Sequence, residues 1–168
     1  MIRSLYLGPE YDLSDIEGDV VNTMYVARLL EERNIVAVYQ GRSEAGPRAL
    51  GNRSLICDGR NELAVKTLNT VIKNRSPFRP TAPCMKLEVA KKYYILKEEL
   101  MDSYTFMGST CRCKEGSISY DFPTTHVDKT ARLQIVESGH FLDKLLDELN
   151  NYNIDTLANR ISNVRTWA

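Results

Sequence analysis

A run of fourteen residues, 41–54, places the strongest constraint on the fold because it combines three glycines, three arginines and a proline. It reads Gly-Arg-Ser-Glu-Ala-Gly-Pro-Arg-Ala-Leu-Gly-Asn-Arg-Ser and follows the apolar, largely β-branched run 35–39. Glycine lets the backbone adopt positive φ angles and approach a ligand closely. Guanidinium groups present planar pairs of donors that match phosphate. The pattern therefore predicts a buried strand followed by a loop for a phosphate-rich ligand.

The charge distribution points to a focused anion site. The chain has 168 residues, 26% of them charged, and a formal net charge of zero. This length fits one domain, 1–168, with an irregular lead-in over 1–18. Neutrality argues against a general surface for nucleic acid or membrane. Residues 41–80, however, hold eight basic residues against three acidic ones. We expect a cytoplasmic protein, since we find no signal-like leader and no apolar span.

The four cysteines are expected to be reduced and structural. Two histidines and the lack of a Cys-x-x-Cys pair argue against a zinc site, and we predict no bound metal. Cys111 and Cys113 alternate along a predicted strand, so both thiols should face the same side.

Hydrophobic periodicity predicts a chain of mixed helices and strands, typical of an α/β or α+β protein. The expected helices cover 19–34, 63–73, 91–101 and 141–150. The expected strands cover 35–40, 55–58, 105–113, 117–120 and 131–136. Prolines 77, 80 and 83 predict an extended segment between them.

Several motifs, in order, resemble the O-carbamoyltransferase family, which includes the nodulation, cephamycin and tobramycin carbamoyltransferases. The matching segments are Leu-Tyr-Leu-Gly-Pro at 5–9, Gln-Gly-Arg-Ser-Glu-Ala-Gly-Pro-Arg-Ala-Leu-Gly-Asn-Arg-Ser at 40–54, Leu-Asn with Ile-Lys at 68–73, Phe-Arg-Pro-Thr-Ala-Pro at 78–83 and Thr-His-Val-Asp-Lys-Thr-Ala-Arg-Leu-Gln at 125–134. The resemblance covers nearly the whole chain but only the C-terminal domain of such enzymes. The chain therefore looks like a stand-alone C-terminal domain that ends earlier than its relatives.

The resemblance implies a YrdC/Sua5-like fold, a twisted mixed β-sheet flanked by helices. It also implies an activity, the formation of carbamoyl-adenylate from carbamoyl phosphate and ATP, with Mg²⁺ on the phosphates. A separate Kae1/TsaD-like transferase would then pass the carbamoyl group to a hydroxyl. The chain has no His-x-x-x-His pair for that second, metal-dependent step.

The same resemblance supplies the candidate site residues. Four basic residues are expected to act on the phosphates: Arg48, Lys73, Arg79 and Arg132. Further candidates for substrate or nucleotide binding are Arg42, Glu44, Gly46, Asn52, Arg53, Ser54, His126 and Asn159.

Each of these candidates has a structural alternative. Glu44 could pair with Arg48 or Arg53, and Asn52 and Ser54 could cap the local backbone. Arg132 could pair with Asp128 or Glu137. Lys73 could be a solvated helix end and Arg48 a surface arginine. His126 is either a base or ligand donor, or a packing residue.

Two departures from the family pattern leave the function open. Lys129 replaces a glycine that allows positive φ, so lysine should strain the turn or add a phosphate contact. Arg160 and Ile161 replace Thr and Ser, removing hydroxyl donors expected near the phosphates. The alternatives to carbamoyl-adenylate formation are therefore a catalytically weak nucleotide-binding or interaction module and, ranked lower, a threonylcarbamoyl-adenylate synthase of tRNA modification.

Overall fold

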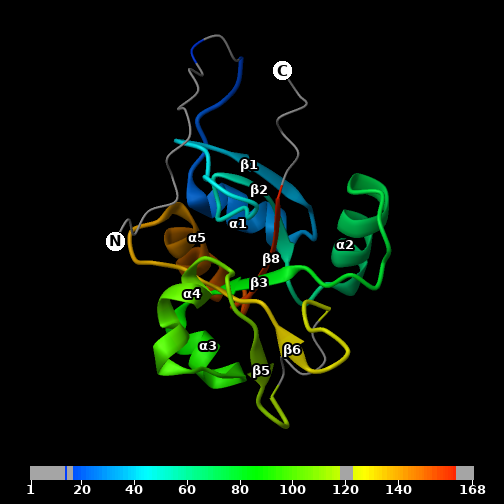
Figure 1. Ribbon diagram of the computed structural model, residues 1–168. Coiled ribbons are helices and arrows are strands. Elements are labelled where there is room, and N and C mark those ends of the chain that lie inside the picture. The colour runs from blue at the N-terminus through cyan, green and yellow to red at the C-terminus, as the bar shows by residue number, and fades with distance from the viewer. Residues whose placement is uncertain (1–13, 15–16, 118–122, 162–168) are drawn as a thin grey trace.

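The computed structural model of the chain describes residue 14 and residues 17–117 and 123–161, which fold around two sheets (Figure 1). In chain order the elements are α1 (Thr23–Glu31), β1 (Val36–Tyr39), β2 (Arg53–Asp58), α2 (Glu62–Thr67), the π-helix η1 (Leu68–Ile72), β3 (Ala82–Met85), α3 (Leu87–Tyr93), β4 (Tyr94–Ile95), the 3-10 helix η2 (Glu98–Leu100), α4 (Met101–Thr105), β5 (Cys111–Cys113), β6 (Thr130–Ala131), β7 (Gln134–Ile135), α5 (Phe141–Asn150) and β8 (Leu157–Ile161).

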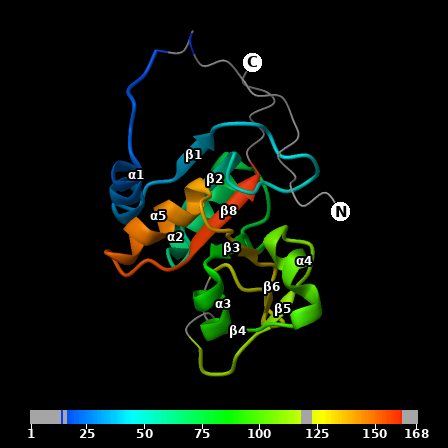
Figure 2. The ribbon, with the colours of Figure 1, turned by 90° about the vertical axis from the view of Figure 1, so that its left-hand side faces the viewer.

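The large sheet is mixed and has the strand order β1-β2-β8-β3-β7. Only β3 and β7 run parallel; the other neighbouring strands are antiparallel. β8, which comes last along the chain, occupies the middle of the sheet and pairs with β2 on one side and β3 on the other. A small antiparallel sheet, β4-β5-β6, lies beside it (Figure 2).

Helices cover both faces of the large sheet. α1 and α5 pack on one face, where Leu30 and Leu145 are fully buried with Ile56 of β2. The next residue of β2, Cys57, belongs to a separate cluster with Val65 and Leu68 of α2 and η1. Successive strand residues point to opposite faces, so this division is the alternation expected for a sheet buried on both sides.

A second core lies between the small sheet and α3 and α4. Tyr93, Tyr94 and Tyr104 are buried there with Cys111 and Cys113 of β5. Both thiols lie on the buried side of β5, while Arg112 between them is exposed, as predicted from the sequence. The two cores divide between neighbouring residues of β3, where Cys84 belongs to the core under α1 and α5 and Met85 belongs to the second core.

The sequence predicts some elements of the large sheet and its covering helices well, but it missed β3 and β8 as strands. α5 has the predicted bounds, and β1, β2 and the α2–η1 segment fall within a few residues of theirs. The predicted helix 19–34 is shorter, and its first turn is fixed by Asn22, whose side-chain oxygen accepts a hydrogen bond from the Tyr25 N–H at 2.9 Å. Much of the lead-in, residues 1–13 and 15–16, lies outside the described residues.

Three predictions in the second half of the chain are wrong. The helix predicted over 91–101 ends at Tyr93, and Tyr94 begins a strand that pairs with β5. The strand predicted over 105–113 is limited to 111–113, because 101–105 is helical and Met107 adopts a φ of 53°. The strand predicted over 131–136 is two strands in different sheets. Residues 118–120 of the predicted hairpin lie outside the described residues.

We expect the thiols to be inert in the native protein. All four cysteines are buried thiols, and burial raises the pKa of Cys57 and of Cys111 to about 12. Because the thiolate is the nucleophile, raising the pKa by three units makes reaction about a thousandfold slower at pH 8. Ellman's reagent should label no thiol of the native chain within minutes and all four in guanidinium chloride. Rapid labelling of the native protein would contradict this.

Candidate functional site

The loop after β1 is held by one buried carboxylate. Glu44 is 8% exposed, and its Oε1 accepts hydrogen bonds from the backbone N–H groups of Leu50 and Asn52 at 2.8 Å and of Arg53 at 3.3 Å. It therefore pairs with backbone amides and not with the Arg48 or Arg53 guanidinium. One side chain thus sets the path of the loop and the direction in which Arg48 leaves it.

The end of the loop leaves no room for a side chain at Gly51. Its φ is 113°, and a Cβ at this position would lie 2.6 Å from the His140 ring and 2.7 Å from Leu142. Its N–H donates to the hydroxyl of Ser54 at 2.9 Å, which confirms the backbone-capping alternative for that serine. Only glycine suits this backbone conformation and this close approach.

Two buried amides fasten the loop to the centre of the large sheet. Gln134 donates to the Leu50 carbonyl at 2.9 Å, and Asn159 of β8 donates to the Ala49 carbonyl at 3.2 Å and to the Gln134 side chain. Asn159 is 2% exposed. The side-chain contacts of Asn159 therefore position the loop after β1.

The remaining polar residues of the loop also contact its backbone. The Arg53 guanidinium donates to the carbonyls of Gln40 and Gly41 and lies 3.7 Å from the centre of the Tyr39 ring. The Asn52 side chain donates to the Arg42 carbonyl at 2.7 Å. These contacts hold the loop against the end of β1. Arg42 and Gly46 are exposed.

Five cations from three separate segments form the basic cluster: Arg48, Lys73, Arg75, Arg79 and Arg132. Partial burial lowers the pKa of Arg132, and the like charges of Arg48 and Arg79 lower it further. The pKa of Lys73 falls through burial and the charge of Arg75, and that of Arg75 through burial and the charge of Arg79. Like charges held this close favour a bound anion.

Within the described residues the basic cluster has no counter-ion. The salt bridges found there join other residues, and Arg48 makes only a long hydrogen bond, 3.4 Å, to the carbonyl of Pro47. Arg132 pairs with neither Asp128 nor Glu137, in contrast to the alternative drawn from the sequence. A set of converging cations of this kind is suited to phosphate groups.

Arg75 is the member of the basic cluster that the sequence analysis did not select. Arg75 follows the π-helix η1, and its backbone N–H donates a hydrogen bond to the backbone carbonyl of the buried Asn69. The side-chain amide of Asn69 donates to the backbone carbonyl of Arg79. The Arg75 Nε is buried without a hydrogen-bond partner among the described residues. Its spacing of two residues from Lys73 is the one sequence signal that could have revealed it.

A tight turn precedes Arg132. The Asp128 carboxylate accepts hydrogen bonds from the Thr130 N–H at 2.9 Å and hydroxyl at 2.6 Å, and it pairs with the His126 ring at 3.0 Å. These hydrogen bonds, from Thr130 first and then from His126, lower the pKa of Asp128 to about 2. His126 is therefore oriented by Asp128 at the edge of the site.

Lys129 occupies a backbone conformation that favours glycine. Its φ is 63°, in the left-handed region, which costs an L-residue roughly 1–2 kcal/mol. This confirms the strained turn expected from the replacement of glycine. The side chains of Arg160 and Ile161, the other departure, lie outside the described part of the chain.

A cavity of about 270 Å³ lies beside Arg132. Its wall is formed by residues of the segment before and within β3 and by the turn before β6: Pro80, Thr81, Ala82, Thr110, Thr124, His126, Thr130, Ala131 and Arg132. Thr81 and Thr130 lie within quoted motifs, but only the tertiary fold brings them together with Thr110 and Thr124. The cavity and the basic cluster together form the candidate site.

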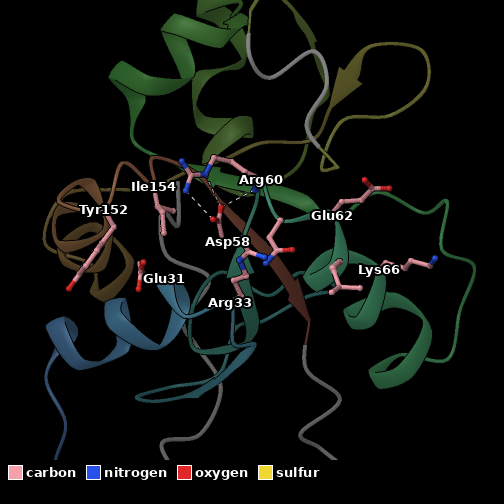
Figure 3. A pocket seen from close by; sticks show the side chains of 10 residues that line it. Glu31, Arg33, Asp58, Arg60, Glu62, Lys66, Tyr152 and Ile154 are labelled. Atoms are coloured by element: carbon pink, nitrogen blue, oxygen red, sulfur yellow. Dashed lines mark hydrogen bonds and ion pairs between the residues drawn. The ribbon is translucent and has the colours of Figure 1, made fainter.

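A larger open depression, of about 820 Å³, lies near the ends of α1 and β2 (Figure 3). Its lining includes three acidic and three basic residues, and Arg60 donates to Asp58 through Nε at 3.1 Å and Nη2 at 3.0 Å. The charges balance and the best-placed arginine is already paired. We therefore assign the anion site to the basic cluster.

The described residues hold no group of three or more His, Cys, Asp or Glu side chains that could bind a metal ion. None of their helices is both long enough and apolar enough to cross a membrane.

The sequence is similar to a nodulation protein and to an O-carbamoyltransferase. It is 36% identical over 110 residues to the nodulation protein NolNO of Sinorhizobium fredii, covering 66% of this chain and 16% of that protein. It is 34% identical over 145 residues to the 3'-hydroxymethylcephem-O-carbamoyltransferase of Streptomyces clavuligerus, covering 77% of this chain and 26% of the enzyme. The chain thus spans 16% and 26% of these two relatives' length.

Solved structures share the fold. Full-length HypF in a phosphate- and nucleotide-bound form matches with a TM-score of 0.59 at 20% identity, covering 85% of this chain and 17% of that one. A variant of Sua5 from P. abyssi matches with a TM-score of 0.55 at 15% identity, covering 82% of this chain and 37% of that one. These matches confirm the predicted Sua5-like fold.

The family described as Carbamoyltransferase C-terminus matches residues 27–166, a span that includes the basic cluster, the loop held by Glu44 and the cavity. The chain therefore belongs to the carbamoyltransferase C-terminal domain family.

Proposed function

We propose that this domain forms carbamoyl-adenylate from carbamoyl phosphate and ATP, the activating half-reaction of O-carbamoyl transfer. The observation that carries the proposal is the basic cluster, in which the charges of five neighbouring cations act on one another without a counter-ion among the described residues. Membership of the carbamoyltransferase family supplies the substrate, and the nucleotide- and phosphate-bound HypF of the same fold supports a nucleotide.

The reaction makes modest demands on the protein. Carbamoyl phosphate and water give carbamate and phosphate. A carbamate oxygen then attacks the α-phosphorus of ATP, a new O–P bond forms, and the bond to the β-phosphate breaks so that pyrophosphate leaves with the electron pair. Negative charge develops on phosphate oxygens throughout, so fixed cations can supply most of the catalysis by positioning and charge stabilisation.

We assign each part of the site a role. Arg132, Arg48 and Arg79 bind the phosphate groups, and Lys73 and Arg75 extend the same positive surface. Glu44, Ser54 and Asn159 position the loop that carries Arg48, as their backbone contacts indicate. Asn52 and Arg53 do the same from the end of β1. We further propose that Mg²⁺ arrives with ATP on its phosphates.

The product would pass to a separate transferase chain or domain, of the Kae1/TsaD-like type. The relatives that match this chain are much longer, since it covers 16% of the nodulation protein and 26% of the cephem enzyme. The acceptor hydroxyl would be bound by that second component.

Lys129 favours a second candidate function, a catalytically weak nucleotide-binding module that completes or regulates a partner. Its φ of 63° stands where the family pattern has glycine, next to the turn that leads to Arg132. A strained turn at this place would hold the arginine less accurately. Such a module would bind ATP without releasing pyrophosphate.

Pyrophosphate release from ATP and Mg²⁺, measured with and without carbamoyl phosphate, tests the proposal. We expect release only when carbamoyl phosphate is present, and its loss in Arg48→Ala. ATP binding in a calorimetric titration without any release would favour the second candidate. Release that needs bicarbonate and threonine in place of carbamoyl phosphate would instead indicate a threonylcarbamoyl-adenylate synthase.

A further inference from the structure

Two threonine hydroxyls in the wall of the cavity beside Arg132 lack hydrogen-bond partners. Thr81 is 2% exposed and Thr124 is fully buried. Neither Oγ1 has a partner among the described residues. Other threonines of this domain are paired, as in Thr156, which donates to Asp155 at 3.1 Å, and Thr130, which donates to Asp128. A buried hydroxyl left unpaired costs free energy, so such groups usually have a task.

The surroundings of the two hydroxyls are almost neutral. Among the nine residues that form the cavity wall, only His126 and Arg132 carry ionisable side chains, and His126 is paired with Asp128. With about 270 Å³ the cavity is at or below the lower end of the range for small-molecule sites. It suits a small neutral polar group that is attached to an anion.

We propose that Thr81 and Thr124 bind the carbamoyl amide of carbamoyl phosphate and determine the specificity of the domain for it. This inference rests on the function proposed above. With the phosphate group on Arg132, the amide would lie in the cavity beside it. A threonine hydroxyl can both donate and accept, so two of them can match the N–H donors and the carbonyl oxygen of an amide.

The chain order places Thr81 between the basic cluster and the cavity. Thr81 comes directly after Arg79 and Pro80 in the Phe-Arg-Pro-Thr-Ala-Pro segment. Pro80 and Thr81 both line the cavity.

Acetyl phosphate is the discriminating probe, because it carries a methyl group where carbamoyl phosphate carries its amino group. Both anions should meet Arg132 in the same way. Only the carbamoyl compound can satisfy both hydroxyls, and a site built for hydrogen bonds rejects an analogue that leaves them unpaired. We expect the wild-type chain to bind carbamoyl phosphate about tenfold or more tightly than acetyl phosphate.

Thr81→Val and Thr124→Val, made in the full chain, test the two hydroxyls by calorimetric titration with both phosphates. Each variant should weaken binding of carbamoyl phosphate about tenfold and leave binding of acetyl phosphate unchanged. Their melting temperatures without ligand should not fall, because valine has the shape of threonine and removes an unpaired buried hydroxyl. Thr81→Ser, which keeps the hydroxyl, should retain the discrimination.

Thr156→Val is the matched control, since its hydroxyl is buried but paired. It should lower the melting temperature and leave both affinities unchanged. If the threonine variants weaken both phosphates equally, or neither, the inference is overturned while the proposed function stands. If the wild-type chain binds neither phosphate in an Arg132-dependent way, the proposed function fails and this inference with it.

Discussion

Arg132→Ala should weaken binding of carbamoyl phosphate by about 10- to 100-fold, because a hydrogen bond between charged groups contributes roughly 1.5–3 kcal/mol. Arg79→Ala should have a similar effect, since the charge of Arg79 already acts on Arg132 in the free protein. Titration calorimetry at a fixed, low salt concentration measures both. Arg132→Lys should recover only part of the affinity, because lysine keeps the charge but not the planar pair of donors.

The same variants should leave the free protein at least as stable as the wild type. Arg132 is held near two like charges without a counter-ion among the described residues, so its removal relieves repulsion. Arg112→Ala, an exposed arginine of β5, is the control and should change neither affinity nor stability. A large loss of stability in Arg132→Ala, with binding intact, would show that the cluster is structural.

Glu44→Ala should lower the free energy of unfolding by about 3 kcal/mol, because it removes the acceptor of three backbone N–H groups, one of them buried and two partly buried. That is a large part of the 5–15 kcal/mol that stabilises a typical domain. Urea unfolding followed by circular dichroism measures the change. Binding of carbamoyl phosphate should also weaken, since the loop carries Arg48.

Glu44→Gln tests whether the side-chain oxygen of residue 44 is what stabilises the loop. Glutamine keeps one side-chain oxygen that can accept hydrogen bonds, so it should lose clearly less stability than alanine. Glu115→Ala, in an exposed turn, should be neutral. Equal and small losses in Glu44→Ala and Glu44→Gln would contradict the position assigned to this carboxylate.

The sequence predicts β1 and β2 of the large sheet, but it did not reveal β3 or the central β8 as strands, and it joined β6 and β7 into one strand. Apolar alternation and the helix period locate β1, β2 and α5, because both faces of the large sheet are covered. The helix predicted over 91–101 failed because Tyr93 and Tyr94 are both buried in the second core. Packing of both tyrosines in this core ends the helix at Tyr93 and begins β4 at Tyr94. Local helix and strand propensities do not predict such tertiary packing.

The candidate site shows a similar division. The resemblance to the carbamoyltransferase family pointed to Arg48, Lys73, Arg79 and Arg132, and the charges of these residues and of Arg75 act on one another in the structure. The partners of Glu44 and the threonines of the cavity depend on segments that are distant in sequence. Their roles depend on which backbone amides and hydroxyls become buried in the folded protein, and a sequence motif does not predict this burial.

The central place of β8 has a consequence for the newly made protein. The strand that joins β2 to β3 is also the last of the described strands to be synthesised. Until residues 157–161 emerge, the segments that carry Arg48 and Arg79 have no strand between them, and Asn159 cannot fasten the loop after β1. Contacts between distant residues form slowly. The large sheet is therefore completed late, and its centre depends on pairing between segments that are far apart in the chain.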